Sequence, residues 1–424
     1  MQVCHAPFLG GTLNGEPTGP WSFPGLIALS IVARLPIGMG AVGLLALGQE
    51  RNYDTSHTTL LVTAFTVALA VTQPAWGRAV DRRGLPLVLR TAIVVHLSGC
   101  LIILLTDTVG EGPFTVLLTA CGAGLLGAGI PPVGAAMRAT WNRLLSDDLA
   151  RGRARVAESV IAEGVHILGR LVVAALSLIS IAALLPLQAA LLTVGALSLA
   201  RDQRIAGTGP TALGSRTLLA LRAAAPLLLL VLVATTAHGC VATVLVLGAD
   251  GGTTAVGAVL FSAWSLGSLL GGLALLRVGG GQTSPALVPI GLLVFAASLP
   301  LLLPALATAG DGPVALLLSS SAVVLLGLPL APTFTGLYLL AERVAPVGRE
   351  TETNALLNST VLIAFGGGSA LTGALVGARL PGWGRDGWSI AEAGVWPALA
   401  CTLTALALAG LAVRRTQPMG VAAP

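Results

Sequence analysis

The sequence has 424 residues, of which 55% are hydrophobic and only 10% are charged. A soluble domain carries roughly 25% charged residues, so this composition excludes an ordinary soluble protein of this size and indicates a surface that faces lipid. The net charge of +5 comes from scattered arginines with few aromatic residues between them, which argues against a nucleic-acid partner.

Twelve apolar segments are each long enough, at about 20 residues, to cross the hydrocarbon core as a helix. Turn-forming or charged residues separate most of them. Near Ser180 no charge marks the break between the fifth and sixth segments, and without that break the count would be eleven. The predicted spans are 23–48, 57–77, 87–106, 114–137, 155–178, 181–200, 223–248, 255–276, 285–307, 313–339, 354–378 and 395–413.

The distribution of arginine orients these spans. If the N-terminus is cytosolic, eighteen arginines, among them Arg138 and Arg349, fall in the even-numbered connections and the C-terminal tail. Only three, Arg51, Arg379 and Arg385, fall in external connections. This positive-inside bias predicts a multi-pass protein of the cell membrane with both termini in the cytoplasm.

Two parts of the sequence repeat each other at one offset. Residues 108–113 resemble 308–313, Leu125-Leu126-Gly127 recurs as Leu325-Leu326-Gly327, and Pro132 recurs as Pro332. Matches in one register predict two six-helix halves related by a parallel repeat. The predicted organisation is a cytosolic tail 1–22, an N-terminal bundle 23–200, a cytosolic linker 201–222, a C-terminal bundle 223–413 and a cytosolic tail 414–424.

Three glycine patterns inside the spans predict close helix packing through small residues. They are Gly122-x-Gly124-x-x-Gly127, Gly267-x-x-x-Gly271 and Gly373-x-x-x-Gly377. The first also matches a dinucleotide-binding pattern, but that pattern requires a preceding strand, and this one lies within an apolar helix.

The segment Gly77-Arg78-Ala79-Val80-Asp81-Arg82-Arg83-Gly84 resembles the loop signature of the major facilitator superfamily, G-x-x-x-D-R-x-G-R-R. Leu85 and Pro86 replace its closing basic pair, and the second-half copy, 272–279, has Leu276 where the acid stands. The resemblance implies an all-α membrane protein with 12 transmembrane helices as two six-helix bundles, working as a monomer.

In that family the loop latches the two halves on the cytosolic face in the outward-open state. The resemblance therefore gives a gating role to Gly77, Asp81, Arg82, Arg83 and Gly84. The alternative is that the arginines only set topology. Two other family signatures are not kept: Gly169-Arg170 replaces the Gly-Pro of the antiporter pattern, and Leu118 and Cys121 replace the Arg and Gln of the fourth-span pattern.

Ionisable residues inside spans are costly in lipid and are functional candidates by default. Glu163, His166 and Arg170 fall within a sector of about 60° on one face of the fifth span. Arg34 in the first span lies at a depth similar to that of Glu163, which predicts an ion pair between them. Two interpretations stay open: a permanent structural pair, or a proton-coupling pair in which Glu163 takes up a proton.

Polar residues of the seventh and tenth spans are candidates for a substrate cavity. His96 and His238 are each either a neutral packing residue or a group protonated during transport. His238 has polar neighbours, and the seventh span lines the cavity in the family. The cavity candidates are Met39, Thr235, Thr236, His238, Ser319, Thr333, Thr335 and Tyr338, and their composition suits a small, moderately apolar solute.

Together with the topology, the resemblance implies a secondary transporter that works by alternating access. By analogy with the drug-efflux members of the family, we expect it to export small amphipathic molecules and to be coupled to proton antiport. Its partners would be the lipid bilayer, a small-molecule substrate and protons. The alternatives are a gradient-driven importer of a small metabolite, or a membrane sensor or scaffold without transport. We expect no enzyme activity, metal site or cofactor, since the sequence shows no nucleophile–base set, metal-ligand cluster or P-loop.

Overall fold

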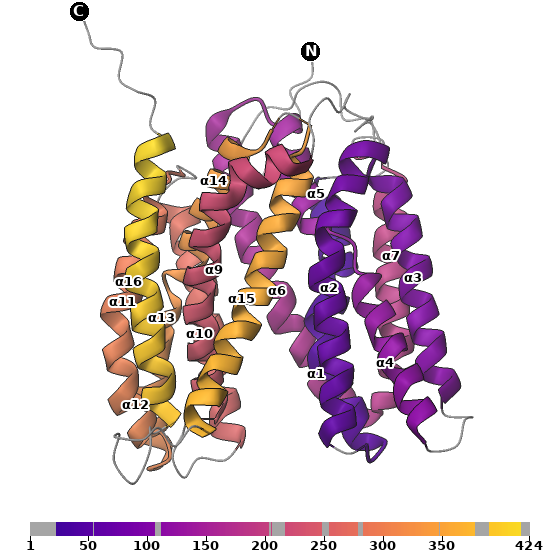
Figure 1. Cartoon of the computed structure of the whole chain (residues 1–424), viewed down its shortest axis with the longest axis horizontal. Coiled ribbons are helices and arrows are strands. Elements are labelled where there is room, and N and C mark those ends of the chain that lie inside the picture. The colour runs from indigo at the N-terminus through magenta and orange to yellow at the C-terminus, as the bar shows by residue number, and fades with distance from the viewer. Residues whose placement is uncertain are drawn as a thin grey trace, which may run out of the picture. The chain divides into compact units, whose positions relative to one another are not determined.

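A computed structural model describes residues 23–53, 55–106, 112–202, 205, 217–247, 254–278, 283–346, 348–377 and 390–416 (Figure 1). The elements are α1 (Phe23–Glu50), α2 (Thr55–Arg83), α3 (Leu85–Leu105), α4 (Pro113–Ala128), α5 (Val133–Leu144), α6 (Asp148–Ile179), η2 (Ile181–Ala183), α7 (Leu184–Ala200), α9 (Thr217–Leu247), α10 (Thr254–Val278), α11 (Leu287–Ser298), η3 (Leu299–Leu301), α12 (Leu302–Thr308), α13 (Pro313–Gly327), α14 (Leu330–Val344), α15 (Glu350–Gly377) and α16 (Ile390–Thr416).

The described residues contain twelve helical segments that are long and apolar enough to cross a membrane, which confirms the predicted number. The uncharged break at Ser180 is present: this residue is extended, with φ −169° and ψ 109°, between α6 and η2. The second span is longer than predicted, because α2 continues to Arg83. The family signature is therefore helical from Gly77 to Arg83 and leaves the helix only at Gly84.

The predicted fourth and tenth spans are both present, but each contains a break in its helix. The fourth consists of α4 and α5 with an interruption at 129–132, and the tenth consists of α13 and α14 with an interruption at 328–329. Prolines explain both breaks, since Pro131, Pro132 and Pro329 have no N–H to continue a helix. The length of an apolar segment predicts that it can cross a membrane, but this length does not distinguish one continuous helix from two shorter helices in line.

Buried or partly buried side chains of α2 and α3 hydrogen-bond the carbonyl groups that the first interruption frees. His96 Nδ1 lies 3.0 Å from the Leu126 carbonyl oxygen. Trp76 Nε1 donates to the Ala128 oxygen at 2.7 Å, and Gln73 Nε2 donates to the Ile130 oxygen at 2.9 Å. Free carbonyls at membrane depth are costly, so these contacts stabilise the break. They favour the packing interpretation of His96.

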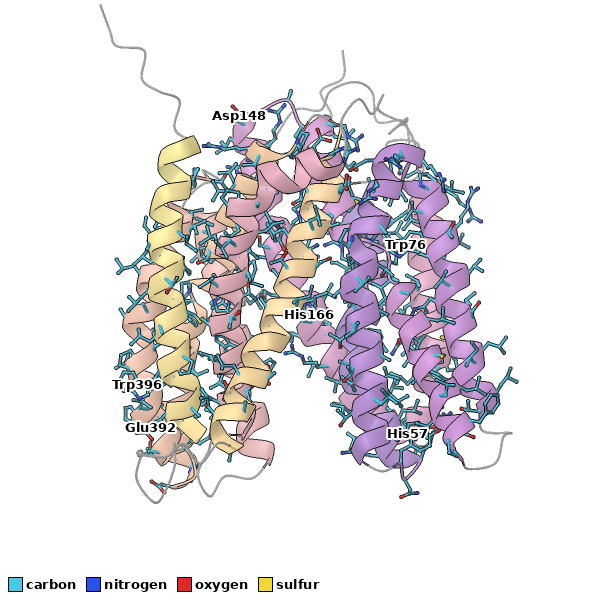
Figure 2. All side chains as sticks on the ribbon, in the orientation of Figure 1. His57, Trp76, Asp148, His166, Glu392 and Trp396 are labelled. Carbon is cyan, nitrogen blue, oxygen red and sulfur yellow. The ribbon has the colours of Figure 1, made fainter. Side chains whose placement is uncertain are left out.

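Apolar side chains stand exposed on the outer faces of many helices (Figure 2). Leu178 and Ile179 are 89% and 85% exposed, and Val314 is 72% exposed. Contiguous exposed apolar surface of this kind is rare in a monomeric soluble protein. In a lipid bilayer this apolar surface contacts hydrocarbon chains, so its exposure carries no free-energy penalty.

Contacts divide the chain into two compact units. Unit 1 consists of 1–154, 164–220 and 345–359, and unit 2 consists of 155–163, 221–344 and 360–424. Each unit thus contains most of one predicted half and a short segment of the other. Unit 1 has a core around Leu89, Met137 and Trp141, and unit 2 has one around Val241, Trp264 and Phe295.

The predicted borders of the halves stay predictions. The tail 1–22, linker residues 203–204 and 206–216, and tail residues 417–424 lie outside the described residues.

Two of the three glycine patterns pack as predicted. A Cβ on Gly127 would overlap the Phe65 carbonyl group of α2, and one on Gly267 or Gly271 would overlap the backbone of the α13 region. Gly373 differs, because nothing lies within 4 Å of its Cβ position. The packing prediction is wrong at that position.

Candidate functional site

Asp81, near the end of α2, caps the first turn of α15. Its Oδ1 accepts a hydrogen bond from the Thr351 backbone N–H at 3.3 Å, and its Oδ2 accepts one from the Glu352 N–H at 2.8 Å. The first N–H groups of a helix have no partner within the helix, and this end carries partial positive charge. A carboxylate from a residue 270 positions away thus caps the start of α15.

Beside this cap, one buried carboxylate pairs with two arginines. Arg78 Nε lies 3.0 Å from Glu352 Oε1, and Arg349 Nη1 lies 3.0 Å from Glu352 Oε2. The side chains of Glu352 and Arg349 are each only 1% exposed. We call Gly77, Arg78, Asp81, Arg349 and Glu352 the Asp81 cluster. It joins α2 of the first sequence half to the start of α15, which belongs to the second.

The two signature glycines permit this arrangement in different ways. A Cβ on Gly77 would lie 2.7 Å from the Ala355 Cβ and 2.9 Å from the Glu352 Cα, so a larger residue would separate α2 from α15. Gly84 has φ 83° and ψ 154°, which disfavours any residue with a Cβ. Its N–H donates to the Val80 oxygen at 2.9 Å, so it ends α2 before α3 begins.

Arg82 and Arg83, also given a gating role, are exposed at the end of α2. In the described residues the cluster's ion pairs instead use Arg78 and Arg349. Arg143 on α5 also lies near enough to Glu350 and Asp81 to interact with their charges. The gating role of all five predicted residues stays a prediction.

Unit 2 contains a counterpart built from different residues. Gly272, the glycine of the incomplete second copy of the signature, packs against Val160 of α6. This contact corresponds to that of Gly77 with Ala355, because the sequence separation between Gly77 and Gly272 equals that between Val160 and Ala355. At this place Leu276 offers no carboxylate. The charged contact is Arg155 Nε with Glu342 Oε2 at 2.7 Å, with side chains 15% and 10% exposed.

We expect Arg155→Gln or Glu342→Gln to destabilise the protein by about 2 kcal/mol, because each leaves a largely buried charge without this partner. Exchanging the charges, Arg155→Glu with Glu342→Arg, should recover most of the loss. Thermal unfolding in detergent measures both effects. Single variants as stable as the wild type would show that the pair contributes nothing.

The intramembrane charges occupy α1, α5 and α6. The Arg34 side chain is 8% exposed, and its Cζ lies 3.6 Å from the Cβ position of Gly134 on α5. Arg138 Nη1 lies 3.8 Å from the same position, and Arg138 is 3% exposed. Its assignment to a connection is therefore wrong: α5 continues past it to Leu144.

Glu163, His166 and Arg170 are partly buried on α6, on which Figure 2 labels His166. Arg34 belongs to unit 1 and Glu163 to unit 2, so their pairing stays a prediction.

Four of the six cavity candidates that carry a hydroxyl group donate it to a protein oxygen. Ser319 donates to the Ala305 oxygen at 2.6 Å, Thr333 to the Pro329 oxygen at 2.7 Å, and Thr335 to Ser159 Oγ at 3.0 Å. Thr236 donates to the Leu232 oxygen at 2.8 Å, and Met39 is fully buried.

His238 differs from these residues because aromatic rings surround it. Its ring centroid lies 4.8 Å from that of Phe295, 5.9 Å from that of Phe334 and 6.2 Å from that of Trp264. The Tyr338 ring lies 6.3 Å from that of Phe334, with the two planes tilted by 34°. Two predicted residues, His238 and Tyr338, thus meet in one aromatic group. The sequence did not indicate the three added rings, since hydropathy does not fix the rotation of an apolar helix.

No protein-family model matches the sequence, and no curated protein matches it. Solved structures do resemble the fold. A bacterial homologue of the iron transporter ferroportin, in an outward-facing state, aligns with TM-score 0.68 and 12% identity over 92% of this chain and 100% of that one. Another structure of a bacterial ferroportin homologue, in an outward-facing state with soaked iron, aligns with TM-score 0.65 and 14% identity, over 91% of this chain and 98% of that one.

A variant of the E. coli fucose:proton symporter aligns with TM-score 0.63 and 14% identity, over 91% of this chain and 98% of that one. Likeness at this identity establishes the fold alone. Over the residues that the structure describes, the chain is therefore an all-α membrane protein with the major facilitator fold, in which twelve helices long and apolar enough to span a membrane form two six-helix bundles.

Proposed function

We propose that this chain is a secondary transporter that exports small amphipathic molecules by alternating access, in exchange for protons. The Asp81 cluster is the observation that carries the proposal. It joins helices of the two sequence halves through a helix cap and two ion pairs. Charged contacts of this kind form and break as discrete states, which a gate that closes and opens requires.

Two further observations support this function. The similar structures include an iron transporter homologue and a proton symporter. The candidate hydroxyls of Ser319, Thr333 and Thr335 already donate to protein oxygens, so they are poorly placed to bind a strongly polar solute. This favours an amphipathic substrate. The second candidate, proton-driven import of a small metabolite, is favoured by the likeness to the fucose:proton symporter.

A drug-susceptibility panel tests export. A host without its own efflux transporters should tolerate lipophilic drugs better when it expresses the protein, and a protonophore should abolish that gain. Export from the cell also requires a location in the cell membrane, which is the location expected from the arginine bias. A host that becomes more sensitive, or is unchanged across the panel, would contradict export.

Glu163 is the proposed proton carrier, so Glu163→Gln should uncouple transport. The variant keeps the shape of the side chain but cannot exchange a proton. We expect it to move substrate down its gradient yet to stop responding to an imposed pH gradient. Glu50→Gln, at the exposed end of α1, is the matched control and should stay coupled. A Glu163→Gln protein that couples like the wild type would exclude this role.

A further inference from the structure

Four polar atoms on α9 and α10 are buried without a hydrogen-bond partner among the described residues. They are Thr235 Oγ1, His238 Nδ1, Trp264 Nε1 and Ser268 Oγ. Their residues are 1%, 4%, 4% and 0% exposed. Buried polar groups in native proteins nearly always have a partner, so four neighbouring exceptions call for a bound molecule.

The four groups form one patch. Thr235 and His238 are three residues apart on α9, and Trp264 and Ser268 are four apart on α10, so each pair shares one helix face. The His238 and Trp264 ring centroids lie 6.2 Å apart, which brings the two faces together. We call these four residues the α9–α10 patch.

Aromatic rings border the patch. Phe295 meets the His238 ring edge-on at 4.8 Å, and Phe261 meets the Trp264 ring at 5.7 Å. Phe334 and Tyr338 complete the group. The whole chain has only eight Phe and two Tyr, so three Phe and one Tyr here exceed what composition predicts.

The chemistry of these groups restricts the ligand. The indole N–H of Trp264 donates only, so the ligand must carry a hydrogen-bond acceptor. No residue of the patch or its aromatic border has a fixed charge, and burying an uncompensated charge is costly, so the ligand is neutral. Aromatic borders favour flat rings that stack or meet edge-on.

We propose that the α9–α10 patch binds a flat, uncharged heteroaromatic solute through a ring nitrogen or carbonyl oxygen. The proposal rests on the proposed transport function and names the substrate class of that function. His238 and Thr235, predicted from sequence as cavity residues, act in it together with Trp264 and Ser268, which the sequence did not single out.

Three probes of matched shape test this with the purified full chain in detergent. Quinoline is neutral at pH 7.5 and has a ring nitrogen acceptor, naphthalene lacks the acceptor, and N-methylquinolinium replaces it with a fixed charge. Quinoline should raise the unfolding temperature of the protein saturably. The concentration of quinoline that gives half of the maximal rise should be at least about fivefold lower than that of naphthalene or of N-methylquinolinium. Equal effects of all three probes, or no effect of quinoline because water alone satisfies the groups, would overturn the proposal.

Trp264→Phe removes the indole N–H and keeps an aromatic ring. It should weaken quinoline binding about fivefold and leave naphthalene binding unchanged. Trp396→Phe, at an exposed position on α16 (Figure 2), is the matched control and should bind like the wild type. If Trp264→Phe does not fold, Thr235→Val makes the same test, since removing an unpartnered hydroxyl leaves folding intact. If the folded variant binds quinoline as the wild type does, the polar group removed in that variant (the indole N–H of Trp264 or the hydroxyl of Thr235) does not bind the ligand.

Transport of quinoline separates this proposal from the proposed function. Saturable binding without gradient-driven movement in proteoliposomes would leave the site intact and refute transport. Gradient-driven movement of other drugs, without selective quinoline binding in detergent, would leave the function intact and refute the site.

Discussion

We expect Asp81→Asn to abolish or strongly slow transport while the protein still inserts into the membrane. Both carboxylate oxygens of Asp81 accept hydrogen bonds from the first turn of α15. Asparagine keeps the shape but has one acceptor oxygen and no charge to complement the helix dipole. The loss of about 1–2 kcal/mol shifts the populations of the transporter's states roughly tenfold. Uptake or efflux rates, normalised to protein in the membrane, measure the effect.

Asp148→Asn is the control for the charge change. Asp148 begins α6, its side chain is 96% exposed, and it pairs with Arg151 three residues away. This variant should transport at the wild-type rate. If Asp81→Asn also does, the signature in this chain only sets topology, and the Asp81 cluster is not a gate.

Glu352→Gln should have the largest effect on stability, a loss of about 3 kcal/mol. The Glu352 carboxylate pairs with Arg78 and with Arg349, and the side chains of Glu352 and Arg349 are 1% exposed. A neutral amide leaves the Arg349 charge buried without that carboxylate. Thermal unfolding in detergent, followed by size-exclusion chromatography, should show the loss as a lower midpoint.

Two variants show whether the loss comes from this buried charge. Glu350→Gln changes a less buried carboxylate two residues earlier, which accepts from the Gly348 N–H, and should cost under about 1 kcal/mol. Arg349→Met combined with Glu352→Gln removes both charges and should recover part of the stability. A double variant less stable than Glu352→Gln alone would contradict this explanation.

The fold followed from the sequence because hydropathy and span length determine how a chain inserts in lipid. The break at Ser180, which no charged residue marks, was included in the predicted spans and is present in the structure. The interruptions of the fourth and tenth spans were not predicted, since α4 and α5 together are as apolar as one helix. The residues that indicate these interruptions are Pro131, Pro132 and Pro329. Because proline also occurs inside apolar spans, these residues alone did not predict where the helices break.

The candidate site was predictable only in part. Gly77 and Asp81 lie in a short local motif, so their importance was visible in the sequence. Glu352 and Arg349 are far away along the chain and precede the predicted start of the eleventh span at residue 354. Arg138 was expected in the connection after the fourth span, whereas α5 continues past it to Leu144. The rings around His238 depend on helix rotation, which a uniformly apolar helix does not encode.

Proton-driven transport in proteoliposomes tests the central claim most directly. The purified protein is reconstituted with an internal pH-sensitive dye, and a drug to which the host gains tolerance is added under an imposed pH gradient. We predict proton flux that begins with drug addition, in exchange for drug, and that disappears in Asp81→Asn. Drug movement that is identical with and without the gradient, or identical in protein-free vesicles, would contradict proton-coupled secondary transport.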